Sequence, residues 1–384
     1  MSLPAGRSAD VAIIGGGIVG TATAALLARA GVRVTLYERT AIAAGASGRN
    51  SGVIQQPHDP VLAALYHESL AAYRALDGIS AGALALDAEP AGLLHVGRDI
   101  GVVEAIADAW RTADPLTRPE VLVGRELCRL EPALADDLVA CRLDIGYPVA
   151  PAAATLAFAS AAERAGATLV VGEAARPVIH DGVAAAVEVG GVVHPVGAVV
   201  IAAGPWTPAL VDPHGEWRPI LPIWGVVAQV DLPGAPRHAM EEAGIDIEPD
   251  GGGDDITGSS AEDGIEFSLV TAAGATSLGS TFLAAEPHPA ELIDKIRARG
   301  SRFVPGLASA PLVAVRSCAR PVSLDGRPLV GAVPWLDRVF VAAGNGPWGI
   351  STGPATARMV ADLVLGNDSS VPATLSPGRF GRTV

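Results

Sequence analysis

The hydrophobic pattern at the start of the chain predicts a strand, a turn, a helix and a second strand. Residues 10–14 form a short apolar run, a glycine turn covers residues 15–20, and an alanine- and leucine-rich segment follows. A second strand-like segment covers residues 32–38, with Val32, Val34 and Leu36 as its apolar positions, and ends on Glu38. Short apolar runs bounded by turn residues are typical of buried strands, and the longer segment between them is typical of a helix. An acid at the end of the second strand completes a βαβ unit of the dinucleotide-binding type.

The same pattern predicts further helices and strands along the chain. Asp59 followed by Pro60 indicates a helix start, and this helix is predicted to extend to about Leu76 and to end at Gly78. Other helices are predicted over residues 101–112, 152–165 and 355–365, and strands over residues 168–171, 198–202, 223–230, 278–283 and 339–343, with a hairpin turn at Asp181-Gly182.

The order of these elements predicts an α/β fold with two domains. We expect residues 1–82, 146–215 and 316–384 to share one sheet in a discontinuous Rossmann-like domain. Residues 83–145 and 216–315 are expected to form a second, α+β domain with a mostly antiparallel sheet. Residues 246–263 form an acidic, glycine-rich stretch that is typical of a solvated loop, with a substrate lid as the alternative.

Composition narrows the kinds of partner and compartment. The 384 residues carry a formal net charge of −14, which disfavours nucleic acid as a partner because phosphate binding needs basic patches. The three cysteines are widely spaced and form no CxxC pair, so we expect no metal site and no disulfide framework. Residues 1–9 lack an apolar run and residues 11–32 contain the glycine turn, so we expect neither a secretion signal nor a membrane span. These features predict a cytoplasmic protein.

Each glycine of the turn has a physical task in holding a dinucleotide. Gly15 allows the tight turn, Gly17 lets the backbone approach a pyrophosphate, and Gly20 lets the helix pack close to the strand. The free N–H groups at the start of the helix face the phosphate charge. Glu38 can accept hydrogen bonds from the adenosine ribose. The turn by itself fits NAD as well as FAD.

Five motifs in this order resemble the D-amino-acid-oxidase-like family of FAD-dependent oxidoreductases, which includes glycine oxidase, sarcosine oxidase and D-amino-acid dehydrogenases. The motifs are the glycine turn with Glu38, Ala46-Ser47-Gly48-Arg49-Asn50-Ser51-Gly52-Val53-Ile54, Val199 to Trp206, Arg320 to Gly331, and Ala342 to Pro354. The resemblance spans most of the chain. It implies that the Rossmann-like domain binds FAD and that the second domain binds the substrate.

The resemblance also implies which residues contact the FAD along its length. These are Gly15, Gly17, Ile18, Val19, Gly20, Glu38, Arg39, Ser47, Arg49, Asn50, Ser51, Ala175, Ala203, Gly204, Trp206, Gly344, Gly346, Gly349, Ile350 and Ser351. In the family, the loop that contains Ser47 lies beside the pyrophosphate and the isoalloxazine ring. The C-terminal helix, whose start the family places near Ser351-Thr352, points its N-terminus at the flavin pyrimidine ring. A helix N-terminus carries about half a positive charge, which stabilises the anionic reduced flavin.

Arg320 resembles the arginine with which glycine oxidase clamps a substrate carboxylate; a structural ion pair is the alternative. A guanidinium matches a carboxylate bidentately, and this contact would hold the substrate α-carbon near flavin N5. The family's reaction needs no strong side-chain base, because the amine reacts neutral and the α-hydrogen leaves as a hydride. Trp348 and Gly349 are the other residues expected at the catalytic centre.

Two departures from the family limit the prediction. Sarcosine oxidases place a lysine over the flavin to activate oxygen, whereas the matching position here is Ser277, and the only lysine, Lys295, falls in an expected surface helix. The electron acceptor is therefore either O2 or a quinone or protein. Residues 216–314 contain no tyrosine to cap a substrate, so Trp224 and Trp348 are the aromatic candidates, with core packing as the alternative.

We expect the FAD to be held non-covalently, with a covalent link at Cys318 as the alternative. Cys318 lies seven residues before Asp325, as the linked cysteine does in monomeric sarcosine oxidase, whereas the following Arg320-Pro321 resembles the non-covalent pattern. Two histidines, His58 and His67, are candidates to approach the flavin. His95 is expected to be a hydrogen-bonded strand histidine rather than a catalytic one.

The leading prediction is an enzyme that oxidises the Cα–N bond of a small, carboxylate-bearing amino acid or N-alkyl amino acid with FAD. A 2-hydroxy-acid oxidoreductase is one alternative, because residues 49–54 also resemble the loop of L-2-hydroxyglutarate-oxidising relatives. A flavin-binding subunit of a larger electron-transfer complex is the alternative from another class.

Overall fold

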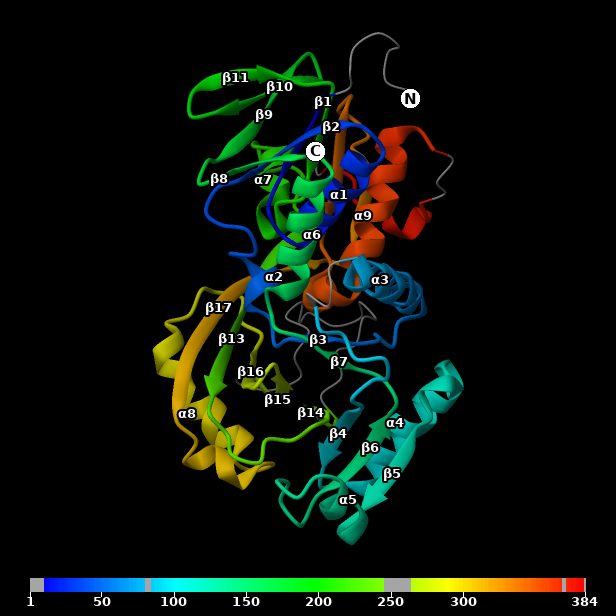
Figure 1. The fold of residues 1–384 in the computed structure, drawn as a ribbon, viewed down its shortest axis with the longest axis vertical. Helices are drawn as coiled ribbons and strands as arrows, with labels where there is room; N and C mark the ends of the chain where they lie inside the picture. Colours follow the sequence, from blue (N-terminus) through cyan, green and yellow to red (C-terminus); the bar gives the residue numbers. More distant parts are fainter. Residues whose placement is uncertain (1–9, 80–83, 245–263, 368–370, 383–384) are drawn as a thin grey trace.

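The computed structural model describes residues 10–79, 84–244, 264–367 and 371–382 (Figure 1). The upper half of Figure 1 holds a largely parallel sheet with its helices, and the lower half holds a curved, mostly antiparallel sheet. The predicted loop or lid at residues 246–263 and the segment at residues 1–9 lie outside the described residues.

The upper sheet joins strands from three distant parts of the chain. In spatial order its strands are β18 (Leu329–Ala332), β19 (Val339–Ala343), β12 (Ala198–Ile201), β1 (Asp10–Ile14), β2 (Arg33–Glu38) and β8 (Thr168–Val171). Every neighbouring pair is parallel except β18 with β19. The helices of this half are α1 (Ile18–Arg29), α3 (Pro60–Ile79), α6 (Ala153–Arg164) and α9 (Gly349–Leu365). Helix α1 packs against both α6 and α9, and α3 packs against α9.

Smaller elements complete the upper half. A separate antiparallel sheet contains β9 (Ala175–His180), β10 (Val183–Val189) and β11 (Val192–Pro195), and the short elements are α2 (Ala46–Arg49), β3 (Val53–Ile54), β7 (Tyr147–Pro148) and α7 (Thr207–Val211). The predicted hairpin turn between β9 and β10 is confirmed. Asp181 and Gly182 have φ of +50° and +77°, the left-handed pair that a tight two-residue hairpin requires.

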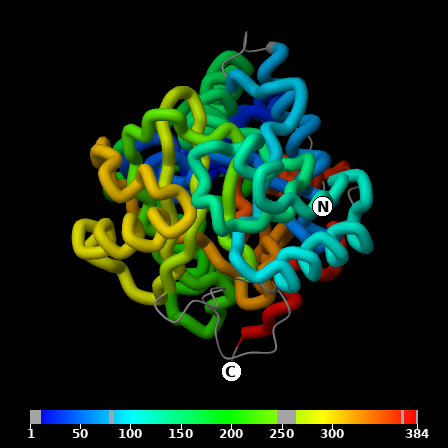
Figure 2. Tube along the Cα trace, turned by 90° about the horizontal axis from the view of Figure 1, so that it is seen from below, coloured from blue at the N-terminus to red at the C-terminus, as the bar shows by residue number. Residues whose placement is uncertain are grey.

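The lower sheet has eight strands and forms the floor beneath the upper half. In spatial order they are β17 (Leu312–Ser323), β13 (Ile220–Val230), β16 (Ala275–Thr281), β15 (Ile265–Ala272), β14 (Ala239–Glu242), β4 (Leu93–Gly97), β6 (Val139–Leu143) and β5 (Glu120–Val123). Its helices are α4 (Ile100–Ala113), α5 (Gly124–Leu130) and α8 (Pro289–Gly300). Seen from below, the cyan segment that contains α4 lies opposite the yellow-to-orange segment that contains α8 (Figure 2).

The lower sheet is predominantly antiparallel, as predicted. Among the described strands of this sheet, only β14 and β4 pair in parallel. The predicted domain border between residues 315 and 316 falls inside β17, which pairs with β13 over its whole length. The other domain borders stay a prediction.

Helix α9 begins six residues before the predicted start at residue 355. The prediction was wrong because Pro354 lacks the N–H that the Ile350 carbonyl would accept, and an interior proline usually ends a helix. Here the Tyr73 hydroxyl of α3 donates to the Ile350 carbonyl at 2.7 Å, and the Ser69 hydroxyl accepts from the backbone N–H of residue 355 at 3.1 Å. Helix α3 therefore supplies the missing hydrogen bonds, and α9 extends further toward the site.

Candidate active site

A cavity of about 1760 Å³ runs from the glycine turn after β1 to the face of β17. Small-ligand pockets are usually about 300–1,000 Å³, so this cavity has room for a dinucleotide and a substrate together. It is lined by every residue expected to contact cofactor or substrate except Gly20 and Gly344. Gly20 packs against the backbone of the turn, and a Cβ on Gly344 would face Leu329.

Steric exclusion keeps the glycine turn free of side chains. Gly15 has φ of +118°, and a Cβ there would lie 2.3 Å from the Ala202 carbonyl oxygen. A Cβ on Gly20 would lie 2.0 Å from the Gly15 carbonyl oxygen, and one on Gly17 would lie 3.0 Å from Ser47 Oγ. The first turn of α1 therefore borders the cavity, where its positive end suits a pyrophosphate, and its Ile18 N–H donates to Ser47 Oγ at 3.0 Å.

The end of the cavity beside β2 fits an adenosine. Glu38 Oε2 accepts the Gly16 N–H at 2.8 Å, and Glu38 Oε1 accepts the Thr40 N–H at 2.9 Å. The Thr40 hydroxyl also donates to Oε1 at 2.9 Å. A carboxylate has about four acceptor sites, so about one remains for a ribose hydroxyl. The Arg39 guanidinium lies 4.0 Å from the ring centre of Trp206, and both side chains line the cavity.

The loop after α2 is fixed by its own asparagine. Asn50 Nδ2 donates to the carbonyl oxygens of Ser47 at 2.9 Å and Pro151 at 3.1 Å, and its Oδ1 accepts a backbone N–H within the loop. The Asn50 side chain therefore holds the loop in shape. Arg49 Nη1 donates to the Ser317 carbonyl oxygen at 2.9 Å, which ties the loop to the lower sheet.

The N-terminus of α9 opens into the middle of the cavity. A 3-10 turn, Gly346–Trp348, leads into the helix and lines the cavity together with residues 349–351. Among the described residues no side chain caps this helix, so its first N–H groups and the positive end of its dipole face the cavity. Ser351 Oγ accepts the Gln55 backbone N–H at 2.9 Å, which joins this terminus to the strand-end loop after β3.

Arg320 lies half-buried on β17, at the opposite end of the cavity. Its Nη1 donates to the Thr281 carbonyl oxygen at 2.7 Å, its Nη2 donates to Ser280 Oγ, and it stacks 4.3 Å from the Phe282 ring centre. A Cβ on Gly225 would lie 2.5 Å from Nη1, so this glycine gives the guanidinium its space. Two of five N–H donors are engaged in these bonds, and the others remain for a carboxylate.

Two carboxylates at the substrate end escaped the sequence analysis. Glu266 lines the cavity, and its charge acts to raise the pKa of Arg320, although burial lowers that pKa overall. Glu241 also lines the cavity, and its Oε1 accepts from Gln55 Nε2 at 3.1 Å. Burial raises the pKa of Glu241. An acid within an otherwise apolar, buried strand was the one signal available in the sequence.

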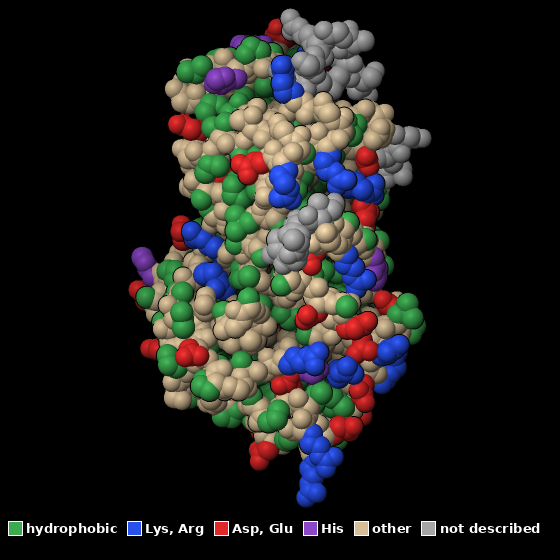
Figure 3. Space-filling view, in the orientation of Figure 1, with side chains coloured by type: hydrophobic (Ala, Val, Ile, Leu, Met, Phe, Trp, Pro, Cys, Tyr) green, Lys and Arg blue, Asp and Glu red, His purple; other side chains and the backbone are tan. Residues whose placement is uncertain are grey.

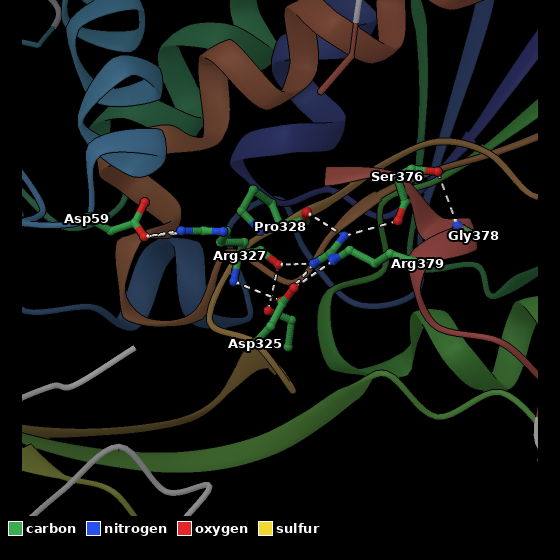
Figure 4. Close-up of polar contacts among 8 residues, drawn as sticks. Asp59, Asp325, Arg327, Pro328, Ser376, Gly378 and Arg379 are labelled. Atoms are coloured by element: carbon green, nitrogen blue, oxygen red, sulfur yellow. Dashed lines mark hydrogen bonds and ion pairs between the residues drawn. The ribbon is translucent and has the colours of Figure 1, made fainter. Parts of the chain in front are cut away.

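The turn after β17 is held by two ion pairs (Figure 4). Arg327 Nη2 donates to Asp59 Oδ2 at 2.7 Å, and Arg379 donates to Asp325 through Nε at 2.7 Å and Nη2 at 2.8 Å. Burial acts to raise the pKa of Asp59, but hydrogen bonds from Arg327 and from the Leu62 N–H outweigh it, so the pKa lies below its ordinary value. The network joins this turn to the start of α3 and to the C-terminal segment.

Ser277, the position expected to match the oxygen-activating lysine, carries a buried hydroxyl beside a cation. Ser277 does not line the cavity; its Oγ accepts from Arg316 Nη2 at 2.7 Å. Burial lowers the pKa of the Arg316 guanidinium. The two-residue period of a strand places Arg316, Cys318 and Arg320 on one face of β17, and that pattern was the signal for Arg316. Lys295 lies on α8 and does not line the cavity.

Of the remaining aromatic and histidine candidates, all but one line the cavity. Trp224, Trp348, His58 and His95 line the cavity, and His67 does not. Nε2 of His95 is buried and has no hydrogen-bond partner among the described residues, so the expectation of a hydrogen-bonded histidine is wrong for this atom. Burial, helped by the charge of His58, lowers the pKa of His95 to about 4, so this imidazole is neutral near pH 7.

Surface charge, hydropathy and possible metal ligands add three findings. Acidic and basic side chains are interspersed over the face shown in Figure 3. No helix in the described ranges is long and apolar enough to cross a membrane. Within the same ranges, no three His, Cys, Asp or Glu side chains are grouped as a metal site would need.

Comparisons with known proteins agree with this geometry. The model of the DAO family, described as FAD dependent oxidoreductase, matches residues 10–363. Glycine oxidase from Geobacillus kaustophilus (strain HTA426) is 29% identical over 376 residues, which cover 92% of each chain. The crystal structure of glycine oxidase from Geobacillus kaustophilus has a TM-score of 0.81 at 25% identity and covers 97% of this chain and 98% of that one. Iminodiacetate oxidase from Chelativorans sp. BNC1 has a TM-score of 0.79 at 23% identity, with 96% and 98% covered.

Proposed function

Because the chain belongs to the DAO family of FAD-dependent oxidoreductases, we propose that it oxidises the Cα–N bond of a small amino acid or N-alkyl amino acid. FAD, when bound, supplies the acceptor for the hydride that leaves the substrate α-carbon. The observation that carries the proposal is Arg320, a half-buried guanidinium that lines one end of a cofactor-sized cavity and keeps N–H donors beyond its two hydrogen bonds. The likeness to glycine oxidase over 92% of each chain supports the same substrate class.

The described side chains fit FAD bound along the cavity. We assign the adenosine to Glu38, Arg39 and Trp206, and the pyrophosphate to the first turn of α1. The flavin ring belongs between the loop after α2 and the N-terminus of α9, where residues 346–351 line the cavity. The positive end of α9 would stabilise negative charge on a flavin held there.

The chain contributes binding, orientation and exclusion of water to the reaction. Arg320 binds the substrate carboxylate and fixes the position of the α-carbon. Orientation of this kind can supply much of the rate acceleration. Trp348 and Gly349 line the cavity and would border the place where flavin and substrate meet. No side chain has to remove the α-hydrogen, because the amine reacts as the neutral base and the resulting imine is hydrolysed in water.

Flavin bleaching without oxygen tests this proposal. The purified protein should carry FAD, and a panel of amino, N-methyl and 2-hydroxy acids is mixed with it anaerobically. We expect an amino or N-methyl acid to bleach the flavin and to release ammonia or an alkylamine. Bleaching by 2-hydroxy acids alone would favour the hydroxy-acid alternative, and bleaching by none of the panel, with copurifying proteins, would favour an electron-transfer subunit.

Two further experiments identify the electron acceptor and the type of FAD linkage. The panel repeated in air identifies O2 as acceptor if hydrogen peroxide forms at the rate of bleaching; a requirement for an added quinone identifies a dehydrogenase. We infer non-covalent FAD, because burial raises the pKa of the Cys318 thiol and so disfavours its nucleophilic thiolate. Flavin fluorescence that stays with the protein band on a denaturing gel would contradict this.

The three unpaired cysteines fit a reducing compartment, and we keep the cytoplasm as the expected location.

A further inference from the structure

Three polar side chains lie side by side on the floor of the substrate end. Glu241 of β14 pairs in register with His95 of β4 on one side and with Ser268 of β15 on the other. Residues paired in this way project from the same face of a sheet, about 4.8 Å apart from strand to strand. All three line the cavity. We call His95, Glu241 and Ser268 the polar row.

The polar row offers hydrogen-bond acceptors without a matching charge. His95 Nε2 and Ser268 Oγ are buried and have no hydrogen-bond partner within the described part of the chain. Glu241 accepts a hydrogen bond from Gln55 Nε2, but no described basic side chain forms an ion pair with it. Glu241 is half-buried, and a carboxylate withdrawn from water without a cation is costly, so a cationic ligand would remove that cost. A neutral ligand would leave the carboxylate uncompensated.

The distance between Arg320 and the polar row sets the length of the ligand. The guanidinium of Arg320 reaches Ser280 on β16, and only β15 separates β16 from β14. Two strand spacings correspond to about 10 Å. That span suits an extended amino acid with its carboxylate at Arg320 and a charged group at the far end of a side chain of about four carbons.

We propose that the polar row binds a positively charged group on the substrate side chain, so that the preferred substrates are amino acids ending in an ammonium or guanidinium. This inference rests on the proposed function, because it places the α-carboxylate on Arg320. Glu241 is then a specificity-determining residue, with His95, Ser268 and Gln55 as hydrogen-bond acceptors around the same cation.

Lysine and norleucine form a matched pair for the test, because they differ at the end of the side chain in the ammonium. Each is tested in its D and L forms as the reductant of the wild-type flavin under anaerobic conditions. We expect kcat/KM for lysine to exceed that for norleucine by about 10- to 100-fold, the usual size of a charge-assisted hydrogen bond. Glu241→Gln should remove this preference, and Glu241→Asp should restore part of it. Glu104→Gln, an exposed change of the same charge on α4, should leave it intact.

Binding of an unreactive analogue separates this inference from the proposed function. 6-Aminohexanoate keeps the carboxylate and the distal ammonium but has no α-amine, and hexanoate lacks both amines. Perturbation of the flavin spectrum should show tighter binding of 6-aminohexanoate, and Glu241→Gln should abolish the difference while FAD content stays at the wild-type level. Equal affinity for the two acids in the wild type would overturn the role of the polar row, even if small neutral amino acids reduce the flavin. Bleaching by no amino acid would overturn the proposed function, while the two analogues would still decide the role of the polar row.

Discussion

The two ends of the cavity are built by different means. At the cofactor end, the backbone dominates: the glycine turn, the first turn of α1 and the N-terminus of α9 border the cavity, and added Cβ atoms on Gly15 and Gly20 would clash with backbone oxygens. At the substrate end, charged side chains line the cavity. They are Arg320, Glu266 and Glu241, which come from three strands of the lower sheet. Changes at the cofactor end should therefore affect assembly, and changes at the substrate end should affect selectivity.

The largest effect is expected from Gly20→Ala at the cofactor end. Its Cβ would lie 2.0 Å from a backbone carbonyl oxygen, which no side-chain movement relieves. Overpacking of this kind costs about 3 kcal/mol or more, equivalent to more than about 100-fold in FAD affinity. We expect protein without FAD, measured by the ratio of flavin to protein absorbance. Gly45→Ala is the matched control: Gly45 lines the same cavity, has φ of −88°, and a Cβ there meets nothing within 4 Å. Loss of FAD in both variants would contradict the steric account.

Gly225→Ala should affect the substrate end and leave the cofactor in place. The added Cβ would lie 2.5 Å from Arg320 Nη1, so the guanidinium must move. Misplacement by about 1 Å costs about 100-fold in rate. We therefore expect kcat/KM for a carboxylate substrate to fall by about 10- to 100-fold with full FAD content. An unchanged kcat/KM would show that the guanidinium does not position the substrate.

The smallest effect is expected from Asp59→Asn, which tests the connection between the two ends. Asparagine keeps the helix cap but loses the charge pair with Arg327, at a cost of about 1–3 kcal/mol of unfolding free energy. The pKa of Asp59 is lower in the folded protein than its ordinary 3.8, so the ion pair stabilises fully above that value and its contribution is lost as pH falls through the folded pKa. Denaturant unfolding at pH 7 should separate wild type and variant, and the gap should narrow below pH 3.8. A gap that is independent of pH would contradict the ion-pair account.

The cofactor end was largely predictable from the sequence, and the substrate end was not. The glycine turn has a fixed spacing because the close backbone contacts that require glycine lie within a few residues of one another. In the structure Gly15 and Gly20 make such contacts. Arg320 was predictable because it sits in a motif that resembles a known clamp. The polar row joins strands that lie far apart in the chain, so no local pattern marks it. The hydrophobic pattern missed the start of α9 for the same reason, since Tyr73, from a distant segment, donates the hydrogen bond that Pro354 cannot supply.

The anaerobic rate of flavin reduction in Arg320→Ala tests the central claim most directly. The wild-type protein and Arg320→Ala are each mixed with an amino acid that reduces the wild-type flavin. In a separate experiment each is mixed with the amine that lacks the carboxylate of that amino acid. The account predicts wild-type FAD content, a loss of at least about 100-fold in the rate with the amino acid, and no change with the amine, because a buried charge pair is worth several kcal/mol. An unchanged rate with the amino acid would show that Arg320 does not hold the substrate.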